Sequence, residues 1–180
     1  MDAVEVTVWG IVPGQGGQSL ILVDSQHQRL LPIVIGIPEA LAILFELKDR
    51  KFERPMTHDL FIRTFDALGV EVDSVLISDL RDATFHALLN LRRAGRAISV
   101  DARSSDAVAI ALRAGVPILV AESVMSQAAH SAESAQQEEW QGDTPGGPTS
   151  LDELGLGPAS YEEVERFRDI LRDAGLDEIP

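Results

Sequence analysis

The order of strand-like and helix-like segments constrains the fold of this chain most, because the same order occurs twice. In each half, three apolar stretches rich in branched residues precede a helix whose first turn carries a carboxylate. The halves align at an offset of 67 residues, with identities at Arg29, Ala40, Ala42 and Ile43 and with Glu39 opposite Asp106. This favours a duplicated β-β-β-α unit as a hypothesis; chance similarity between two Ala-rich helices is the alternative.

The hydrophobic periodicity predicts an α+β fold with a mixed sheet of about seven strands and three to four helices. Strands are expected over residues 4–9, 20–23, 30–35, 70–80, 83–92, 98–101 and 117–121, with a bulge near Asp73. Helices are expected after Gly36, from an N-cap at Thr57, and from caps at Ser104 and Ser105 to about Ala114.

The charge is divided unevenly along the 180 residues, which have a net charge of -14. Residues 1–124 have a net charge of -4 and residues 125–180 a net charge of -10. We therefore expect a folded domain over residues 1–125, a flexible linker over 126–158 and an acidic C-terminal helix and tail over 159–180.

Composition excludes several classes of protein. The chain has no cysteine, so disulfide frameworks, thiolate metal sites and cysteine nucleophiles are ruled out. No stretch stays apolar for the ~20 residues that a bilayer requires, and the first residues do not form a signal peptide. We expect a cytoplasmic protein that does not bind membranes.

A local basic face is compatible with this acidic composition. Arg92, Arg93, Arg96 and Arg103 fall within twelve residues that contain one acid, Asp101. Binding of nucleic acid depends on Lys and Arg at the contacting face, so this cluster is a candidate interface. A solvated surface of mixed charge is the alternative.

Two predicted helix starts carry polar side chains that packing of a hydrophobic core does not explain. Arg54, His58 and Asp59 surround the first, while Asp101, Arg103, Ser105 and Asp106 surround the second. Exposed amides at a helix N-terminus favour an anion, which suggests a phosphate site. Helix capping is the favoured explanation for each residue taken singly among Thr57, Asp59, Ser104, Ser105 and Asp106, but it does not require Arg54, His58, Asp101 or Arg103.

These residues lie in four ordered motifs that resemble the bifunctional nuclease family. The motifs are Leu31–Gly36 with Glu39-Ala40, then Arg54–Leu60, then Asp82–Ala87, and then Asp101–Ala111. The resemblance covers roughly residues 1–125 and implies a compact α+β fold, activity on both RNA and DNA, and a homo-oligomer, with a dimer favoured.

The roles that this activity would require are inferred from chemistry. DNA lacks a 2'-hydroxyl, so cleavage of both nucleic acids needs a water nucleophile, which favours help from Mg²⁺ or Mn²⁺. The expected catalytic residues are His58, Asp59, Asp101 and Asp106, and the expected metal ligands are Glu39, Asp59, Asp101 and Asp106. Arg54, Arg103 and Ser105 are expected to bind the phosphate, together with Arg92, Arg93 and Arg96.

A non-enzymatic function is the alternative interpretation of the same residues. In that reading the chain is an oligomeric anion-binding or regulatory interaction module. Arg54 and Arg103 would then form ion pairs with Asp59 and Asp101 instead of binding a substrate.

Overall fold

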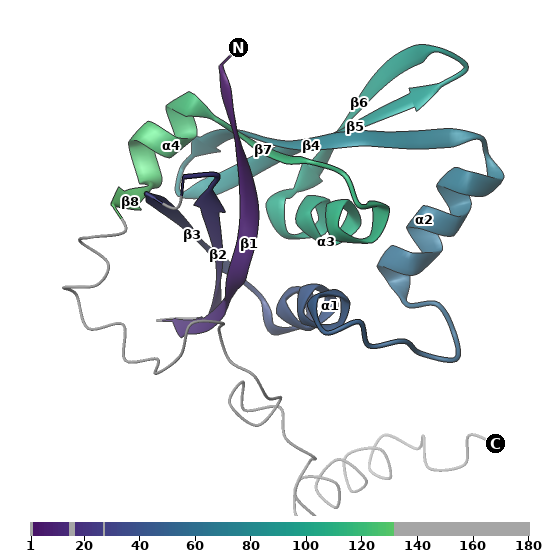
Figure 1. Cartoon of the computed structure of the whole chain (residues 1–180), viewed down its shortest axis with the longest axis horizontal. Helices are drawn as coiled ribbons and strands as arrows, with labels where there is room; N and C mark the ends of the chain where they lie inside the picture. The colour runs from purple at the N-terminus through teal and green to yellow at the C-terminus, as the bar shows by residue number, and fades with distance from the viewer. Residues whose placement is uncertain (1, 15–16, 27, 132–180) are drawn as a thin grey trace, which may run out of the picture. The chain divides into compact units, whose positions relative to one another are not determined.

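One mixed sheet of eight strands organises the fold, which is described by a computed structural model over residues 2–14, 17–26 and 28–131. The strand order is β6-β5-β4-β7-β1-β2-β3-β8. Only β4 and β7 run parallel, and every other neighbouring pair is antiparallel. The predicted α+β class with a mixed sheet is confirmed, with a short eighth strand added (Figure 1).

The first half of the chain forms the meander β1 (Ala3–Gly14), β2 (Gly17–Asp24) and β3 (Arg29–Ile35). Its central strand is buried on both faces, since Leu20, Ile21, Leu22 and Val23 are all at most 2% exposed. This explains why the strand is continuously apolar instead of alternating. The helix α1 (Ile37–Leu47) follows with Pro38 in its first turn, as predicted.

The second half repeats the order with β4 (Val70–Arg81), β5 (Thr84–Arg93), β6 (Arg96–Arg103) and α3 (Ser104–Ala114). The predicted bulge is confirmed between Val72 and Ser74, and a second one lies between Ile77 and Asp79. The fifth strand was expected from Ala83, but Asp82 and Ala83 both have positive φ and form the hairpin turn, so the strand begins at Thr84.

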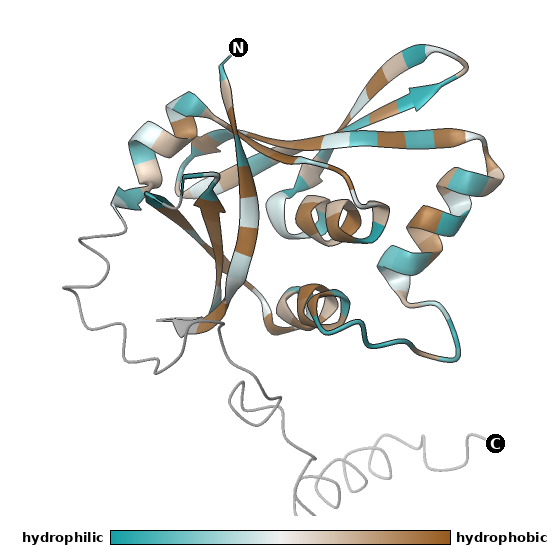
Figure 2. Cartoon of the chain, in the orientation of Figure 1, coloured by the Kyte–Doolittle hydropathy of each residue, from teal (hydrophilic) through white to brown (hydrophobic). Residues whose placement is uncertain are grey.

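The helices α1 and α3 pack against each other on one side of the curved sheet (Figure 1). Their apolar residues and the strands supply the core, which Figure 2 shows as brown segments on both layers. The third helix of this group, α2 (Thr57–Ala67), contacts α3 and β4 but has no buried residue. Each half therefore contributes three strands and one core helix, with α2 added between the halves.

Two predicted helix caps are wrong by one residue. Met56, not Thr57, is the N-cap of α2, and Arg103, not a serine, is the N-cap of α3. Ser104 and Ser105 instead lie inside the first turn of α3 and are buried, so their small size against the core explains them. Gly115 follows as the left-handed C-cap with φ +65°, which places the end of α3 at Ala114 as expected.

The described elements continue past residue 125, the expected end of the domain, as far as residue 131. After β7 (Ile118–Ala121) come the helix α4 (Glu122–Ala128) and the two-residue strand β8 (His130–Ser131). Met125 is buried, and Arg29 holds the start of α4 through a hydrogen bond of 2.7 Å to Glu122. The remainder of the predicted linker and the C-terminal helix lie outside the described residues.

Candidate active site

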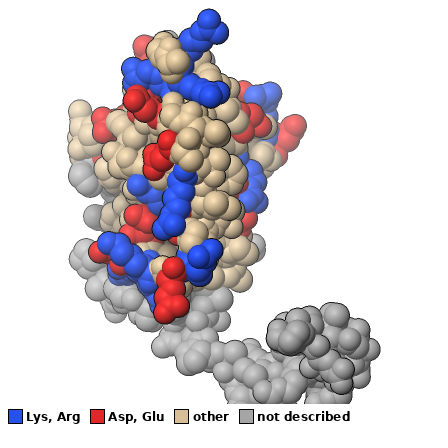
Figure 3. Space-filling model, turned by 90° about the vertical axis from the view of Figure 1, so that its right-hand side faces the viewer, with Lys and Arg blue, Asp and Glu red and all other residues tan. Residues whose placement is uncertain are grey.

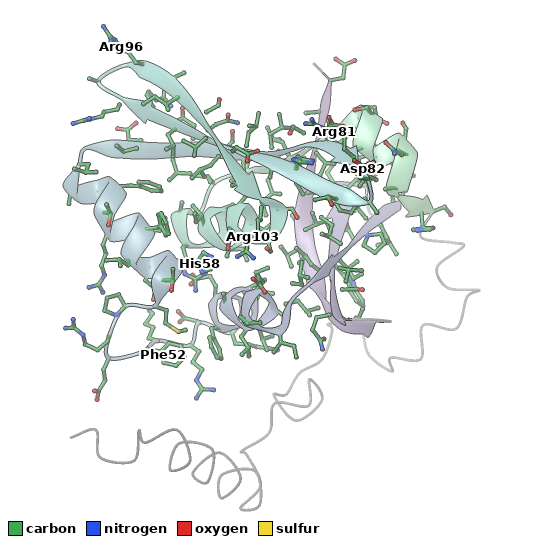
Figure 4. All side chains as sticks on the ribbon, turned by 180° about the vertical axis from the view of Figure 1, so that it is seen from behind. Phe52, His58, Arg81, Asp82, Arg96 and Arg103 are labelled. Carbon is green, nitrogen blue, oxygen red and sulfur yellow. The ribbon has the colours of Figure 1, made fainter. Side chains whose placement is uncertain are left out.

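Four charged or titratable side chains from three helices meet at the start of α3. His58 Nε2 lies 3.0 Å from Asp106 Oδ1, and Arg103 Nε donates to Asp106 Oδ2 at 2.7 Å. Arg103 Nη1 also donates to Glu39 Oε1 at 2.8 Å. The contacts bring His58, Arg103 and Asp106 of the two predicted helix starts together, and Glu39 joins them; Figure 4 shows His58 and Arg103 near each other.

The two halves of the chain supply equivalent parts of this cluster. Glu39 stands in the first turn of α1 and Asp106 in the first turn of α3, the two positions that the 67-residue offset superposes. Because α1 and α3 pack together, both carboxylates reach the same guanidinium, that of Arg103. His58 enters from the first turn of α2, which contacts α3.

Asp106 is ionised at neutral pH. Its partial burial would raise the pKa of the carboxyl, but the hydrogen bonds from Arg103 and His58 outweigh burial and lower the pKa. Asp106 likewise raises the pKa of Arg103 through their hydrogen bonds. An ionised carboxylate can only accept, so the Nε2 of His58 carries the proton and Nδ1 is left to accept or deliver one.

Gly36 leaves room for the Glu39 carboxylate. Its φ of -74° and ψ of 163° suit any residue, so glycine is not needed there for the backbone. A Cβ built on Gly36 would instead overlap Glu39 Oε2, while Oε1 of the same carboxylate binds Arg103. The absence of a side chain at Gly36 therefore allows the conformation in which Glu39 binds Arg103.

A second cluster, which the sequence analysis missed, joins the three helices beside the first. Arg113 Nε donates to Asp59 Oδ1 at 2.6 Å, and its Nη2 donates to the Ala42 carbonyl at 3.0 Å. The side chain of Arg113 is only 7% exposed. In the sequence, Arg113 is marked only by being a lone arginine at the end of the Ala-rich helix, seven residues after Asp106.

Asp59 is occupied by these structural contacts. Its Oδ2 accepts the Met56 backbone N–H at 2.9 Å, which confirms that it caps α2. Burial would raise the pKa of Asp59, but Arg113 and the Met56 amide lower it. Its catalytic and metal-binding roles stay predictions.

Other predicted site residues lie apart from the cluster. Asp101 is exposed on β6 opposite Leu88, and strand alternation places it on the face away from Val100 and the buried Leu89. The ion pairs expected in the non-enzymatic reading, Arg54 with Asp59 and Arg103 with Asp101, are wrong, because Asp59 pairs with Arg113 and Arg103 pairs with Asp106 and Glu39.

Ser105 and Arg54 differ in how well they could reach a substrate. Ser105 is buried, being 6% exposed, so its side chain offers little surface to a phosphate, and the expected contact through its backbone amide stays a prediction. Arg54 is exposed in the loop before α2 and forms no ion pair within the described residues. It remains a candidate contact for a phosphate that binds near His58.

The arginines of the predicted basic cluster are divided between two places. Arg93 and Arg96 lie opposite each other in the strand register beside the β5–β6 turn, while Arg103 lies at the other end of β6. Arg92 is held by ion pairs to Asp73 and Glu71. Figure 3 shows basic and acidic side chains mixed over one whole face, so the expected basic face is not a single patch there.

The residues do not fit the predicted metal site. Within the described ranges, no group of three or more His, Asp or Glu side chains is arranged to hold a metal ion. Glu39 and Asp106 share Arg103, Asp59 binds Arg113, and Asp101 lies on the other face of its strand. None of the described helices is long and apolar enough to cross a bilayer.

The fold and cluster together define a class: an α+β protein with a histidine–carboxylate pair and an accessible guanidinium where three helices begin. The chain belongs to the bifunctional nuclease domain family, whose sequence pattern matches residues 20–133. The structural cluster lies wholly within that match.

The relatives differ in how far they have been described. An uncharacterized protein of Mycobacterium tuberculosis is 39% identical over 178 residues, which cover 99% of this chain and 98% of the relative. Bifunctional nuclease 1 of Oryza sativa subsp. indica is 30% identical over 104 residues, or 56% of this chain and 31% of the rice protein. Bifunctional nuclease 2 of Oryza sativa subsp. japonica is 28% identical over 118 residues, or 63% of this chain and 36% of that protein.

Proposed function

We propose that the protein is a cytoplasmic nuclease that hydrolyses phosphodiester bonds in RNA and DNA. The observation that carries the proposal is the contact of 3.0 Å between His58 Nε2 and Asp106 Oδ1 beside the Arg103 guanidinium. A proton-transfer group and a cation for the phosphoryl oxygens are two of the elements that phosphodiester hydrolysis needs. The family membership and the printed names of the rice relatives point to the same chemistry.

Each residue has a distinct role in this proposal. The ionised Asp106 orients the imidazole of His58, and His58 takes a proton from the attacking water. Arg103, whose side chain is 67% exposed, binds the phosphate and stabilises the charge that develops on it. The water oxygen bonds to phosphorus, the ester bond to the leaving oxygen breaks, that oxygen takes up a proton from solvent, and His58 releases the proton it accepted to solvent.

A cleavage assay tests the proposal. The full chain would be incubated with end-labelled single- and double-stranded RNA and DNA, beside His58→Gln, Asp106→Asn and a His130→Gln control from the exposed strand β8. Losing the acid–base group should lower kcat by about 10²–10⁴-fold, with little change in KM. Equal cleavage by all the proteins would contradict the proposal and indicate a contaminating nuclease.

The predicted Mg²⁺ or Mn²⁺ is tested in the same assay by adding EDTA and then restoring each ion. Cleavage in EDTA supports the metal-free roles given above. Loss of cleavage that Mg²⁺ restores supports the predicted metal, with ligands beyond the arrangement described here.

The non-enzymatic reading stays as a second proposal because one observation favours it. Both carboxylates of the cluster form ion pairs with Arg103, as in an anion-binding pocket with paired charges. Binding of oligonucleotides or inorganic phosphate by wild type and Asp106→Asn, with no cleavage by either, would support this reading.

A further inference from the structure

The strand β6 ends the sheet with an uncovered edge. It is eight residues long, lies at the end of the strand order and is exposed at every residue but Ala102. Proteins commonly shield long edges with charges, bulges or a covering element, because an open edge pairs readily with another strand. No described element covers this edge.

The hairpin turn determines which backbone groups are open. Ala94 and Gly95 have φ of 49° and 77°, so they form a two-residue type I′ turn and make Arg93 and Arg96 a hydrogen-bonded pair. Such pairs alternate along an antiparallel ladder. The backbone N–H and C=O groups of Ala97, Ser99 and Asp101 therefore point away from β5 to the free edge.

Apolar side chains are uncovered on the helix side of the same edge. Ile98 and Val100 are 43% and 44% exposed, although their cross-strand partners Leu91 and Leu89 are buried. On α2, which carries His58, and at its C-cap, the large side chains of Leu60, Phe61 and Leu68 are about half exposed or more. This side of the molecule thus lacks a partner where the edge is also open.

We propose that β6 pairs antiparallel with β6 of a second copy, and that the partner's Arg96 completes the His58–Asp106 site. A two-fold axis perpendicular to the sheet keeps both helix layers on the same side of the joined sheet. Residues that face each other across the axis must then come from the same face of β6, so both are even-numbered or both are odd-numbered. If the axis passes through Ser99, Ile98 of each copy lies opposite the partner's Val100. It also lets the open groups of Ala97, Ser99 and Asp101 bond across the interface.

This register has a consequence for the site. The partner's Arg96 falls opposite Ala102, on the helix side and immediately before Arg103 and the start of α3. Arg96 forms no ion pair within its own described chain and stands at the hairpin tip in Figure 4. Glu39 and Asp106 carry two negative charges against the one positive charge of Arg103, so a second guanidinium complements them and binds the phosphate. This part of the inference rests on the proposed function.

The interface is tested without any activity measurement. The chain has no cysteine, so Ser99→Cys introduces a single thiol. Hydrogen-bonded antiparallel partners lie about 5.5 Å apart at Cα, a separation that a disulfide spans. We expect a dimer by light scattering and a disulfide-linked dimer of Ser99→Cys on mild oxidation, with none for the exposed control Ser123→Cys on α4. A monomeric wild type, or a dimer that Ser99→Cys does not link, would overturn the proposal.

The position of Arg96 is tested by mixing two variants. Coexpressed Arg96→Cys and Ala102→Cys chains should form a mixed disulfide, because these residues face each other across the axis. For activity, Arg96→Ala and Asp106→Asn should each be impaired. Coexpression should restore on the order of a quarter of the wild-type sites, because half of the dimers are mixed and each holds one intact site.

The outcomes separate this inference from the proposed function. Disulfides that form in a protein without cleavage activity support the interface and contradict the nuclease. Cleavage by wild type with no rescue on coexpression, or with no mixed disulfide, supports the nuclease and overturns the contribution of Arg96.

Discussion

Asp106 is the residue through which the site's charges are coupled, since it accepts hydrogen bonds from both His58 and Arg103. Both of its oxygens are used, so the carboxylate orients the imidazole instead of acting as a base itself. The Glu39 carboxylate that binds Arg103 lies where a side chain on residue 36 would begin, and Gly36 leaves this space free. At this scale, the chemistry depends on a few short contacts between charged groups.

Acid should destabilise the protein through Asp106. The folded-state pKa of this carboxyl is lowered from its ordinary value of 3.8, so the unfolded chain binds the proton more tightly. The stabilisation is complete above the unfolded-state pKa and is lost as the pH falls through the lowered pKa. Urea unfolding from about pH 5 to pH 2 should therefore show a flatter pH dependence for Asp106→Asn than for wild type. Parallel curves would contradict the assignment.

The helices are held in position by Arg113, which links α3 to α2 through Asp59 and to α1 through the Ala42 carbonyl. Because α2 has no buried residue, this link and its packing on α3 and β4 determine where His58 stands. The hairpin β5–β6 is the other element of functional interest, since it ends in Arg93 and Arg96.

Arg113→Met should destabilise the protein by about 2–4 kcal/mol. The change leaves Asp59 and the Ala42 carbonyl without their donor, and the estimate is below the full cost of a broken buried pair because Asp59 is partly exposed. Thermal or urea unfolding measures the loss. The double variant Arg113→Met with Asp59→Asn should be closer to wild type than additivity predicts, and strict additivity would count against the coupling.

The hairpin arginines should contribute to binding of nucleic acid more than Arg92 does. Each phosphate contact that is removed should reduce the magnitude of the slope of log K against log salt by about 0.7 on single strands. Arg93→Ala with Arg96→Ala should therefore reduce both affinity and slope, whereas the matched Arg92→Ala, whose guanidinium is held by Asp73 and Glu71, should change them less. Fluorescence anisotropy with a labelled oligonucleotide at several salt concentrations measures both quantities.

On the scale of the whole molecule, net charge opposes the binding of a polyanion. The chain carries -14, and residues 132–180 account for -10 of it. A chain that ends at Ser131 should bind single-stranded oligonucleotides more tightly than the full chain at low salt, and the difference should shrink as screening increases. Equal affinity at all salt concentrations would show that the acidic segment has no electrostatic effect on binding.

Sequence alone determined the elements and their order. Short-range periodicity identified seven strands, the bulge near Asp73 and the helix that ends at Gly115, because hydrogen-bonded turns and apolar spacing depend on neighbouring residues. The motif order also identified the family, which the match over residues 20–133 confirms. The caps of α2 and α3 were misplaced by one residue because serine and threonine also occur inside first turns.

Only the tertiary structure decided which side chains meet. His58 and Asp106 are 48 residues apart, Glu39 and Arg103 are 64 apart, and Arg113 and Asp59 are 54 apart. Such contacts depend on how α1, α2 and α3 pack, and local propensity carries no information about that. Asp101 illustrates the same limit: it is two residues from Arg103 and shares its face of β6, yet it is Arg103, at the junction with α3, that pairs with Glu39 and Asp106.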